Sequence, residues 1–207
     1  MSNGGLEAKE TKGERTRRRL LEAAEQVFAD LGYHDASIVK ITEAAGVSQG
    51  TFYLYFSSKQ EVFDVLVEDL NSRVRHAMSE ASVKGTTRLE KERLGFQAFF
   101  QFTADHPALY RVIRQAEFAS PRMLRLHYER LAEGYVTGLR QASDQGEITI
   151  GDPIVTAWAL MAVGEMIGLR WILWGDTREV PPEVFDETMA FVARALGVSR
   201  EAEDGHG

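Results

Sequence analysis

Hydrophobic residues recur along this chain at intervals of three and four, the pattern of α-helices with one buried face. The first such segment runs from Lys12 to Leu31, and its apolar residues share one stripe. Gly32 follows it and predicts a C-terminal cap. No segment shows the alternation of a sheet, so the chain is predicted to be all-α.

Two short helices are predicted next. Ser37 is expected to cap the first of them and Ser48 the second, which runs from Gln49 to Phe56. Gly46 separates them, because a tight turn favours a residue that tolerates positive φ. The sequence therefore predicts two helices joined by a turn.

Six further helices are expected. Ser58 and Glu61 predict a capping box that opens a long helix ending near Val83. Five more are expected over residues 89–105, 107–118, 121–145, 153–174 and 182–196. The nine helices divide into a three-helix head at residues 1–57 and a larger helical body at 58–200. Residues 1–11 are expected to be disordered, and 201–207 to form a tail.

Composition narrows the class of protein. The sequence has no cysteine, which excludes disulfides and thiolate metal sites and suits the cytoplasm. We expect no secretory signal and no membrane-spanning segment. The net charge of −7 argues against a nucleic-acid binder, but residues 1–60 contain 8 basic and 8 acidic residues, so the acidity lies in the body.

The helix-turn-helix carries the chemistry. In this motif the second helix lies in the major groove of DNA and its exposed residues contact base edges. Phe52 and Phe56, four residues apart, are expected to anchor the inner face of that helix. The outer face then carries Gln49, Thr51, Tyr53, Leu54 and Tyr55.

This stretch resembles the TetR family of bacterial transcriptional regulators. The resemblance covers about the first 70 residues and rests on four segments: Arg17–Gly32, Ile41–Ser48, Gly50–Phe56 and Ser58–Phe63. It implies a homodimer, a palindromic operator and an effector pocket in the body. The rest of the chain resembles the family only in length and helical character.

The resemblance also implies DNA contacts at matching positions. Ser48, Thr51, Tyr55 and Lys59 would hold phosphates. Gln49, Tyr53 and Leu54 would face bases, since glutamine pairs with adenine and leucine packs on a thymine methyl. Lys40 and the run Arg17–Arg19 would add backbone contacts, although that run also fits a solvated helix face.

The body is rich in aromatic residues and methionine, which suits either an ordinary core or an apolar pocket with a few polar anchors. The candidate effector-binding residues are Phe96, Phe99, Phe100, Tyr110, Arg114, Phe118, Met123, His127, Tyr128, Trp158 and Met161. His127 alone fits a structural role better than a ligand contact.

The resemblance to the TetR family implies that the last two helices form a four-helix bundle between two protomers. Gly164 and Gly168 would allow close approach of helices. The remaining candidates for this dimer interface are Met166, Leu169, Phe185, Met189 and Val192.

The effector is predicted to be an acyl- or aryl-coenzyme A thioester, or the related carboxylic acid. The aromatic residues offer an apolar slot, and Arg111, Arg114, Arg122 and Arg125 could meet phosphates. Residues 106–110 and 128–135 are also similar to regulators of fatty-acid or phenylacetate breakdown. The alternatives are a solvated arginine face and a multidrug pocket for lipophilic compounds.

Catalysis finds little support, because the sequence has no phosphate loop, no G-x-S-x-G, no H-E-x-x-H and no cysteine nucleophile. No cofactor or metal is expected. The predicted mechanism is derepression: the effector shifts the fourth helix and moves the recognition helices away from the spacing of about 34–36 Å that successive major grooves require. An activator of the same fold, or a helical enzyme or carrier, remains the rival interpretation.

Overall fold

The computed structural model describes residues 11–198, which form nine α-helices and no strand. The predicted all-α fold is confirmed. The predictions for residues 1–10 and 201–207 lie outside the described part. The helices are α1 (Lys12–Asp35), α2 (Ile38–Ala45), α3 (Gln49–Tyr53), α4 (Lys59–Ser82), α5 (Arg88–Asp105), α6 (Pro107–Ala119), α7 (Pro121–Asp144), α8 (Pro153–Gly168) and α9 (Pro182–Ala195).

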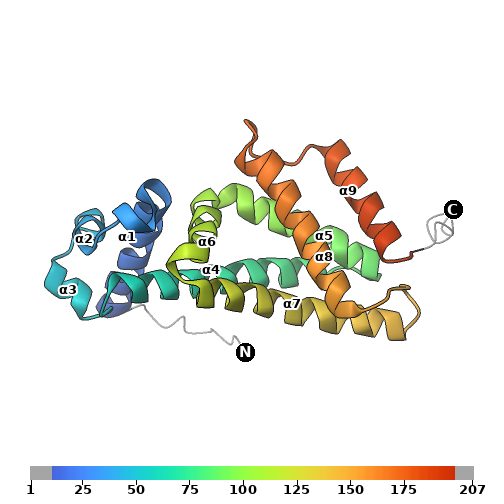
Figure 1. Ribbon diagram of the computed structural model, residues 1–207, viewed down its shortest axis with the longest axis horizontal. Coiled ribbons are helices and arrows are strands. Elements are labelled where there is room, and N and C mark those ends of the chain that lie inside the picture. The colour runs from blue at the N-terminus through green and yellow to red at the C-terminus, as the bar shows by residue number, and fades with distance from the viewer. Residues whose placement is uncertain (1–10, 199–207) are drawn as a thin grey trace, which may run out of the picture.

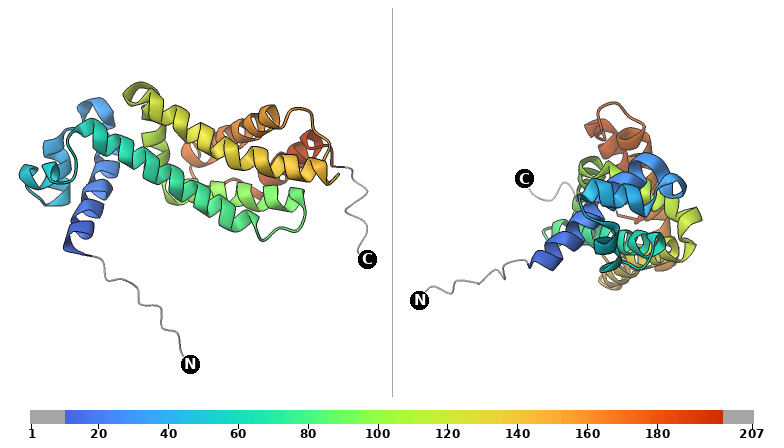
Figure 2. Two further views of the ribbon diagram at one scale, coloured as in Figure 1. Left: turned by 90° about the horizontal axis from the view of Figure 1, so that it is seen from below. Right: turned by 90° about the vertical axis from the view of Figure 1, so that its left-hand side faces the viewer.

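The molecule is elongated, with the head α1–α3 at one end (Figure 1). The long helices α4 and α7 lie side by side along the body, and α4 runs from the head into it (Figure 2). Helix α6 connects the two parts by packing on α1, while α8 and α9 cover the far end of the body. A shift of α4 or α6 would therefore move residues that contact the head directly.

The hydrophobic core of the head does not stop at residue 57. Buried residues of α1–α3 belong to one cluster with Val62, Phe63 and Leu66 of α4 and with Val112 and Ile113 of α6. A second cluster fills the far end of the body between α5, α7, α8 and α9. The hydrophobic packing is therefore continuous across the boundary predicted at residue 57.

Local sequence signals explain the short helices of the head. The hydroxyls of Ser37 and Ser48 accept from the backbone N–H groups of Lys40 and Thr51, each at 3.2 Å. Gly46 adopts φ 62°, as the turn requires. These caps satisfy donors that a helix start otherwise leaves without partners.

Three details differ from the prediction. Gly32, with φ 79°, breaks α1 as expected, but the helical assignment continues past it to Asp35. Helix α3 ends at Tyr53, because the N–H groups of Leu54 and Tyr55 turn back three residues. The hydroxyl of Ser58 caps Glu61 N, but the Glu61 carboxylate accepts from Ser57, so the predicted capping box is only half formed.

Candidate DNA-binding and ligand-binding sites

Buried aromatic side chains and two arginines of α1 hold the second helix of the helix-turn-helix, α3, in place. Phe52 and Phe56 are fully buried, as predicted, and the guanidinium of Arg17 lies 5.5 Å from the centre of the Phe56 ring. Arg19 donates to the carbonyl of Ala45 at the end of α2. Two members of the Arg17–Arg19 run therefore pack on the motif itself.

The outer face of α3 is open to solvent. Gln49 is exposed, Tyr53 is 55% exposed and Leu54 is 79% exposed. Ser48 and Thr51 lie beside them, with their hydroxyls 2.9 Å apart. A leucine this exposed beside a tyrosine contributes nothing to the core, so both are available to a partner.

Lys59 has a structural role that the sequence did not reveal. Its ammonium donates to the carbonyl oxygens of Tyr33 at 2.7 Å and Ala36 at 2.9 Å, and lies 4.4 Å from the centre of the Tyr33 ring. These bonds cap the end of α1, and any phosphate contact would compete with them. Lys40 is exposed and donates to Asp35 O, whereas Tyr55 is half-buried.

The body contains an apolar cavity of about 100 Å³ between α4, α5, α6, α7 and α8. Six of the predicted effector-binding residues line it: Phe96, Phe99, Tyr110, His127, Tyr128 and Met161. Phe102, which belongs to the same aromatic cluster in the sequence, also lines it. The sequence did not single out several others, which are Leu70, Val74, Met78, Thr103, His106, Ile113, Leu131, Tyr135, Leu160 and Glu165.

Five predicted effector-binding residues lie elsewhere. Phe118 is 81% exposed, and Trp158 is exposed on the outer side of α8. Met123 is buried in the core shared with the head. Phe100 packs against Phe185 behind the cavity, and Arg114 is a surface side chain near Glu165. A count of aromatic residues could not separate these positions, because only the helix orientations decide which side chains face inward.

Glu165 is the one carboxylate among the residues that line the cavity. It accepts hydrogen bonds from Tyr110 at 3.2 Å and from Tyr128 at 2.9 Å, and Arg114 lies 3.8 Å away. Burial, and then the Glu165 charge, raise the pKa of both tyrosines above the usual value of 10, so they remain donors. The available signal was an acid within an otherwise apolar helix.

A second polar contact joins α4 to α7 at the cavity wall. The amide of Asn71 donates to the carbonyl oxygen of His127 and lies 3.0 Å from its Nδ1. Burial lowers the pKa of His127 to about 4, so the ring is neutral at physiological pH and Nδ1 can accept. The Oδ1 atom of Asn71 is buried and has no protein partner.

The predicted dimer seam is largely inside the protomer. Leu169, Phe185, Met189 and Val192 are buried in its own core, while Gly164 and Gly168 face Phe96 and Phe99 of α5. The glycines bring α8 close to α5 rather than to a second chain. Met166 alone of the predicted residues is exposed, at 56%.

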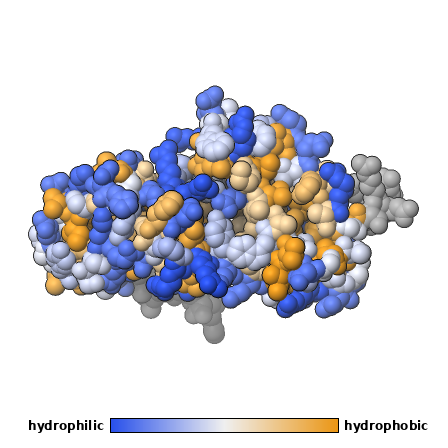
Figure 3. Space-filling view, in the orientation of Figure 1, coloured by the Kyte–Doolittle hydropathy of each residue, from blue (hydrophilic) through white to orange (hydrophobic). Residues whose placement is uncertain are grey.

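The apolar surface of α8 and α9 carries different residues. Val155, Trp158 and Met166 of α8 are exposed together with Phe191 of α9, which is 50% exposed. Figure 3 shows hydrophobic groups gathered over this end of the molecule. Such residues in a cluster mark a contact surface.

The helix from Pro153 to Leu173, including its final π-helical turn, is long and apolar enough to cross a membrane by length and composition alone. This differs from the expectation that no segment approaches that length. Its Glu165 is hydrogen-bonded inside the body, and one side of the helix packs on α5. A single such helix is weak evidence of a membrane span. In this structure 28% of its apolar window is buried, and one apolar face is left uncovered.

Comparisons with known proteins identify the head. The family described as bacterial regulatory proteins, tetR family, matches residues 20–66. The HTH-type transcriptional regulator YdgC of Bacillus subtilis is 35% identical over 106 residues, which is 49% of this chain and 54% of that protein. The chain thus spans about half the length of that relative.

Other matches extend over the body. The fatty acid metabolism regulator protein of B. subtilis is 28% identical over 162 residues, covering 69% of this chain and 82% of that protein. The structure of the transcriptional regulator FadR from B. subtilis in complex with stearoyl-CoA has a TM-score of 0.75 at 22% identity, covering 86% and 98% of the two chains. Residues 20–66 thus match the family described as bacterial regulatory proteins, tetR family, and most of the chain shares the fold of solved transcriptional regulators.

Proposed function

We propose that the chain is a ligand-responsive repressor that binds a palindromic operator as a homodimer and is released by a small molecule. The observation that carries this proposal is the open outer face of α3, where Gln49, Tyr53 and Leu54 stand in solvent above the buried Phe52 and Phe56. These residue types contact base edges and thymine methyl groups in a major groove. Ser48, Thr51 and Tyr55 flank them as candidate phosphate contacts.

The homodimer is proposed to form through the exposed apolar face of α8 and α9. Covering Val155, Trp158, Met166 and Phe191 removes a hydrophobic surface from water. Two-fold symmetry would match a palindromic operator.

Helix α6 supplies a physical link between cavity and head. Tyr110 and Ile113 line the cavity. Two residues further on, the side chain of Gln115 accepts from Tyr33 N at 2.7 Å and donates to Phe28 O at 2.9 Å, both in α1. A ligand that moves α6 would therefore move α1, and the recognition helix packed on it, through direct hydrogen bonds.

The effector is proposed to be an acyl- or aryl-coenzyme A thioester. The names of the relatives support this class, since one is a fatty acid metabolism regulator and one structure holds stearoyl-CoA. The cavity of about 100 Å³ favours a short acyl chain or a single ring, because a cavity of about 150 Å³ accommodates benzene.

A lipophilic cation is the second candidate. Glu165 places a carboxylate on the cavity wall among aromatic rings, an arrangement that attracts positive charge. Calorimetry with phenylacetyl-coenzyme A, hexanoyl-coenzyme A and tetraphenylphosphonium separates the two classes. Binding of a thioester with release of DNA supports the first class, and binding of the cation alone replaces it with the second.

DNA binding is tested on α3 itself. Gln49→Ala and Leu54→Ala should reduce the preference for operator over random DNA by about 1–3 kcal/mol at the contacted base pair, equivalent to about 5- to 150-fold. Gln26→Ala is the matched control, since Gln26 is exposed on α1 and bonds only to Asp30. Unchanged operator preference in both α3 variants would overturn the assignment.

The dimer is tested by sedimentation. Met166→Asp combined with Phe191→Asp would place charges in the proposed interface and should yield monomers at micromolar concentration. Thr137→Asp, on an exposed position of α7, is the control. A parent protein that is monomeric at this concentration would contradict the proposal.

A further inference from the structure

A second cavity, larger and more polar than the first, opens between α4, α5 and α7. It encloses about 800 Å³, within the range of about 300–1,000 Å³ that small-molecule sites occupy. Neither the sequence patterns nor the comparisons point to it. We call it the α4–α5–α7 groove.

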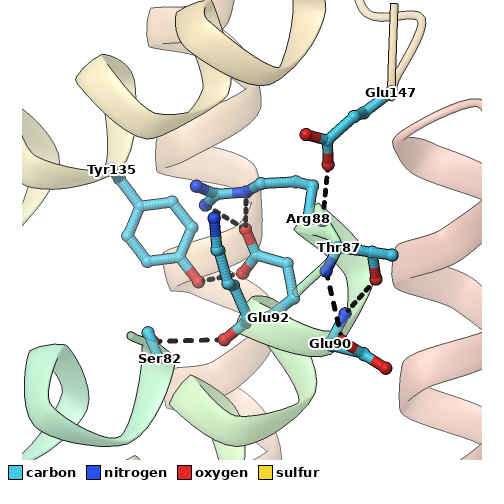
Figure 4. A network of polar contacts seen from close by, with 8 residues as sticks. Ser82, Thr87, Arg88, Glu90, Glu92, Tyr135 and Glu147 are labelled. Carbon is cyan, nitrogen blue, oxygen red and sulfur yellow. Dashed lines mark hydrogen bonds and ion pairs between the residues drawn. The ribbon is translucent and has the colours of Figure 1, made fainter. Parts of the chain in front are cut away.

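A network of hydrogen bonds and ion pairs forms the floor of this groove (Figure 4). The carboxylate of Glu92 is buried, with a side chain only 1% exposed. Its Oε1 accepts from Arg88 Nε at 2.8 Å and from a second Arg88 nitrogen, and its Oε2 accepts from the Tyr135 hydroxyl at 2.6 Å. Glu147 accepts from the backbone N–H of Arg88 at 2.8 Å.

Two glycines of α7 give the groove its shape. A Cβ at Gly138 would clash with an Arg88 nitrogen, so any larger residue there would require the guanidinium to shift. A Cβ at Gly134 would meet nothing within 4 Å. The space beside Gly134 is therefore open, although glycine is unfavourable inside a helix.

Cations without acidic partners line the walls. Both acids of the groove, Glu92 and Glu147, are already bonded to Arg88. Arg75 and Lys91 also line the groove, and within residues 11–198 neither side chain has an ion-pair or hydrogen-bond partner. Two unpaired cations beside a rigid network attract an anion.

The groove and the apolar cavity share a wall. Met78, Leu131 and Tyr135 line both. The ring of Tyr135 faces the cavity wall, and its hydroxyl belongs to the Glu92 network. A molecule with one apolar end and one charged end could therefore place its apolar end in the cavity and its charged end in the groove, on opposite sides of these three side chains.

We propose that the α4–α5–α7 groove binds the anionic head of an amphipathic effector, a phosphate-bearing group, while its apolar end occupies the adjoining cavity. This proposal rests on the proposed ligand-responsive function and deepens it. It also places the anionic group of the effector away from the arginines that were predicted to bind it at the α6–α7 junction. Three of those arginines face acids, with Arg114 near Glu165, Arg122 near Asp64 and Arg125 bonded to Glu129.

The first test uses phenylacetyl-coenzyme A as the probe in calorimetry across salt concentrations. Arg75→Gln with Lys91→Gln should weaken binding about tenfold or more and reduce its salt dependence. Arg111→Gln with Arg122→Gln, which removes two junction cations, is the matched control and should change affinity less than threefold. The reverse result would contradict the proposed site in the groove and would place the anionic group of the effector at the α6–α7 junction. The proposed regulatory function would not be affected.

The second test fills the groove without altering charge. Gly134→Leu should block the probe, because the leucine would occupy open space, and it should not destabilise the helix. Thr137→Leu, exposed one turn away and outside the groove, is the control. Operator binding by both variants shows that each has folded.

The outcomes separate the two proposals. Unchanged probe affinity in Gly134→Leu would contradict the proposal that the groove binds the anionic group, even if the probe still releases DNA. Failure of the parent to bind phenylacetyl-coenzyme A while it binds tetraphenylphosphonium would also overturn it. Failure of the parent to retain any DNA would instead defeat the proposed regulatory function.

Discussion

The head and the body of this molecule bury different kinds of groups. The head is filled with aromatic rings, since Phe28, Phe52 and Phe56 are almost completely inaccessible to solvent. The body instead buries Glu92 and His127 and keeps an apolar cavity of about 100 Å³. A tightly packed head suits a part that must hold one shape, whereas a hollow, polar body leaves room for a ligand.

The helix caps of the head and the polar contacts inside the body differ in how far apart their bonded residues lie in the sequence. The caps at Ser37 and Ser48 each reach a residue three positions on. In the body, Tyr128 bonds to Glu165 and Asn71 to His127, pairs that are 37 and 56 residues apart. Local contacts can be inferred from sequence patterns, but these distant ones depend on the packing of the helices.

The largest expected effect would show how much the body depends on its buried network. Arg88→Ala leaves the buried Glu92 without its cation and should lower the free energy of unfolding by about 3–5 kcal/mol. Arg125→Ala removes an exposed pair with Glu129 at the same helical spacing and should change stability little. Urea unfolding of both variants gives the comparison. Equal, small losses would mean that the network contributes no more than a surface pair.

The second effect is a pH dependence that originates in the body. Burial lowers the pKa of His127 to about 4 in the folded protein, whereas the unfolded chain binds its proton near pH 6.5. Between these values the unfolded state holds more protons, so stability falls as pH falls from about 6.5 to about 4. The full loss is about 3 kcal/mol.

Unfolding measured across this pH range tests the assignment. His127→Gln should flatten the curve by about one proton per molecule. His76→Gln changes an exposed ring of α4 and serves as the control. A curve that keeps its slope in His127→Gln but loses it in His76→Gln would place the titration elsewhere.

The third expected effect is on the stability of the head. It would weaken the contrast between head and body if a polar contact between distant residues also stabilised the head. Lys59→Met removes the ammonium that caps α1 at Tyr33 and Ala36, and should lower stability by about 1–2 kcal/mol. Lys40→Met, which removes one bond to Asp35 O, should cost less. If Lys59→Met lost only DNA affinity and no stability, the side chain would act through phosphate as the family resemblance implies.

These contrasts explain which features the sequence could predict. The helices and the turn at Gly46 follow from local periodicity, caps and positive φ. For the cavity, composition identified Tyr110, Tyr128 and Met161 but also Phe118, which stands in solvent. Periodicity marks a helix face as apolar without specifying which neighbour covers it. For the same reason the dimer prediction selected Met189, which is buried within the protomer.

The smallest expected change in stability concerns the cavity itself. Ala24 in the head and Thr103 in the body are both buried in helices, but only Thr103 borders open space. Ala24→Met should cost about 1–3 kcal/mol, because no space is available to the added atoms. Thr103→Met should change stability by less than about 1 kcal/mol, since a flexible side chain can enter the cavity.

The Thr103→Met variant also distinguishes a functional cavity from a packing defect. Thr103→Met should keep operator affinity but resist release by phenylacetyl-coenzyme A, because the methionine occupies the space that the ring requires. Thr103→Ser provides a control that enlarges the cavity slightly. Operator binding in a fluorescence anisotropy titration, with and without the probe, measures both effects. If Thr103→Met were released as readily as the parent, the ligand would enter the body at another place, and the hollow in the body would be no more than imperfect packing.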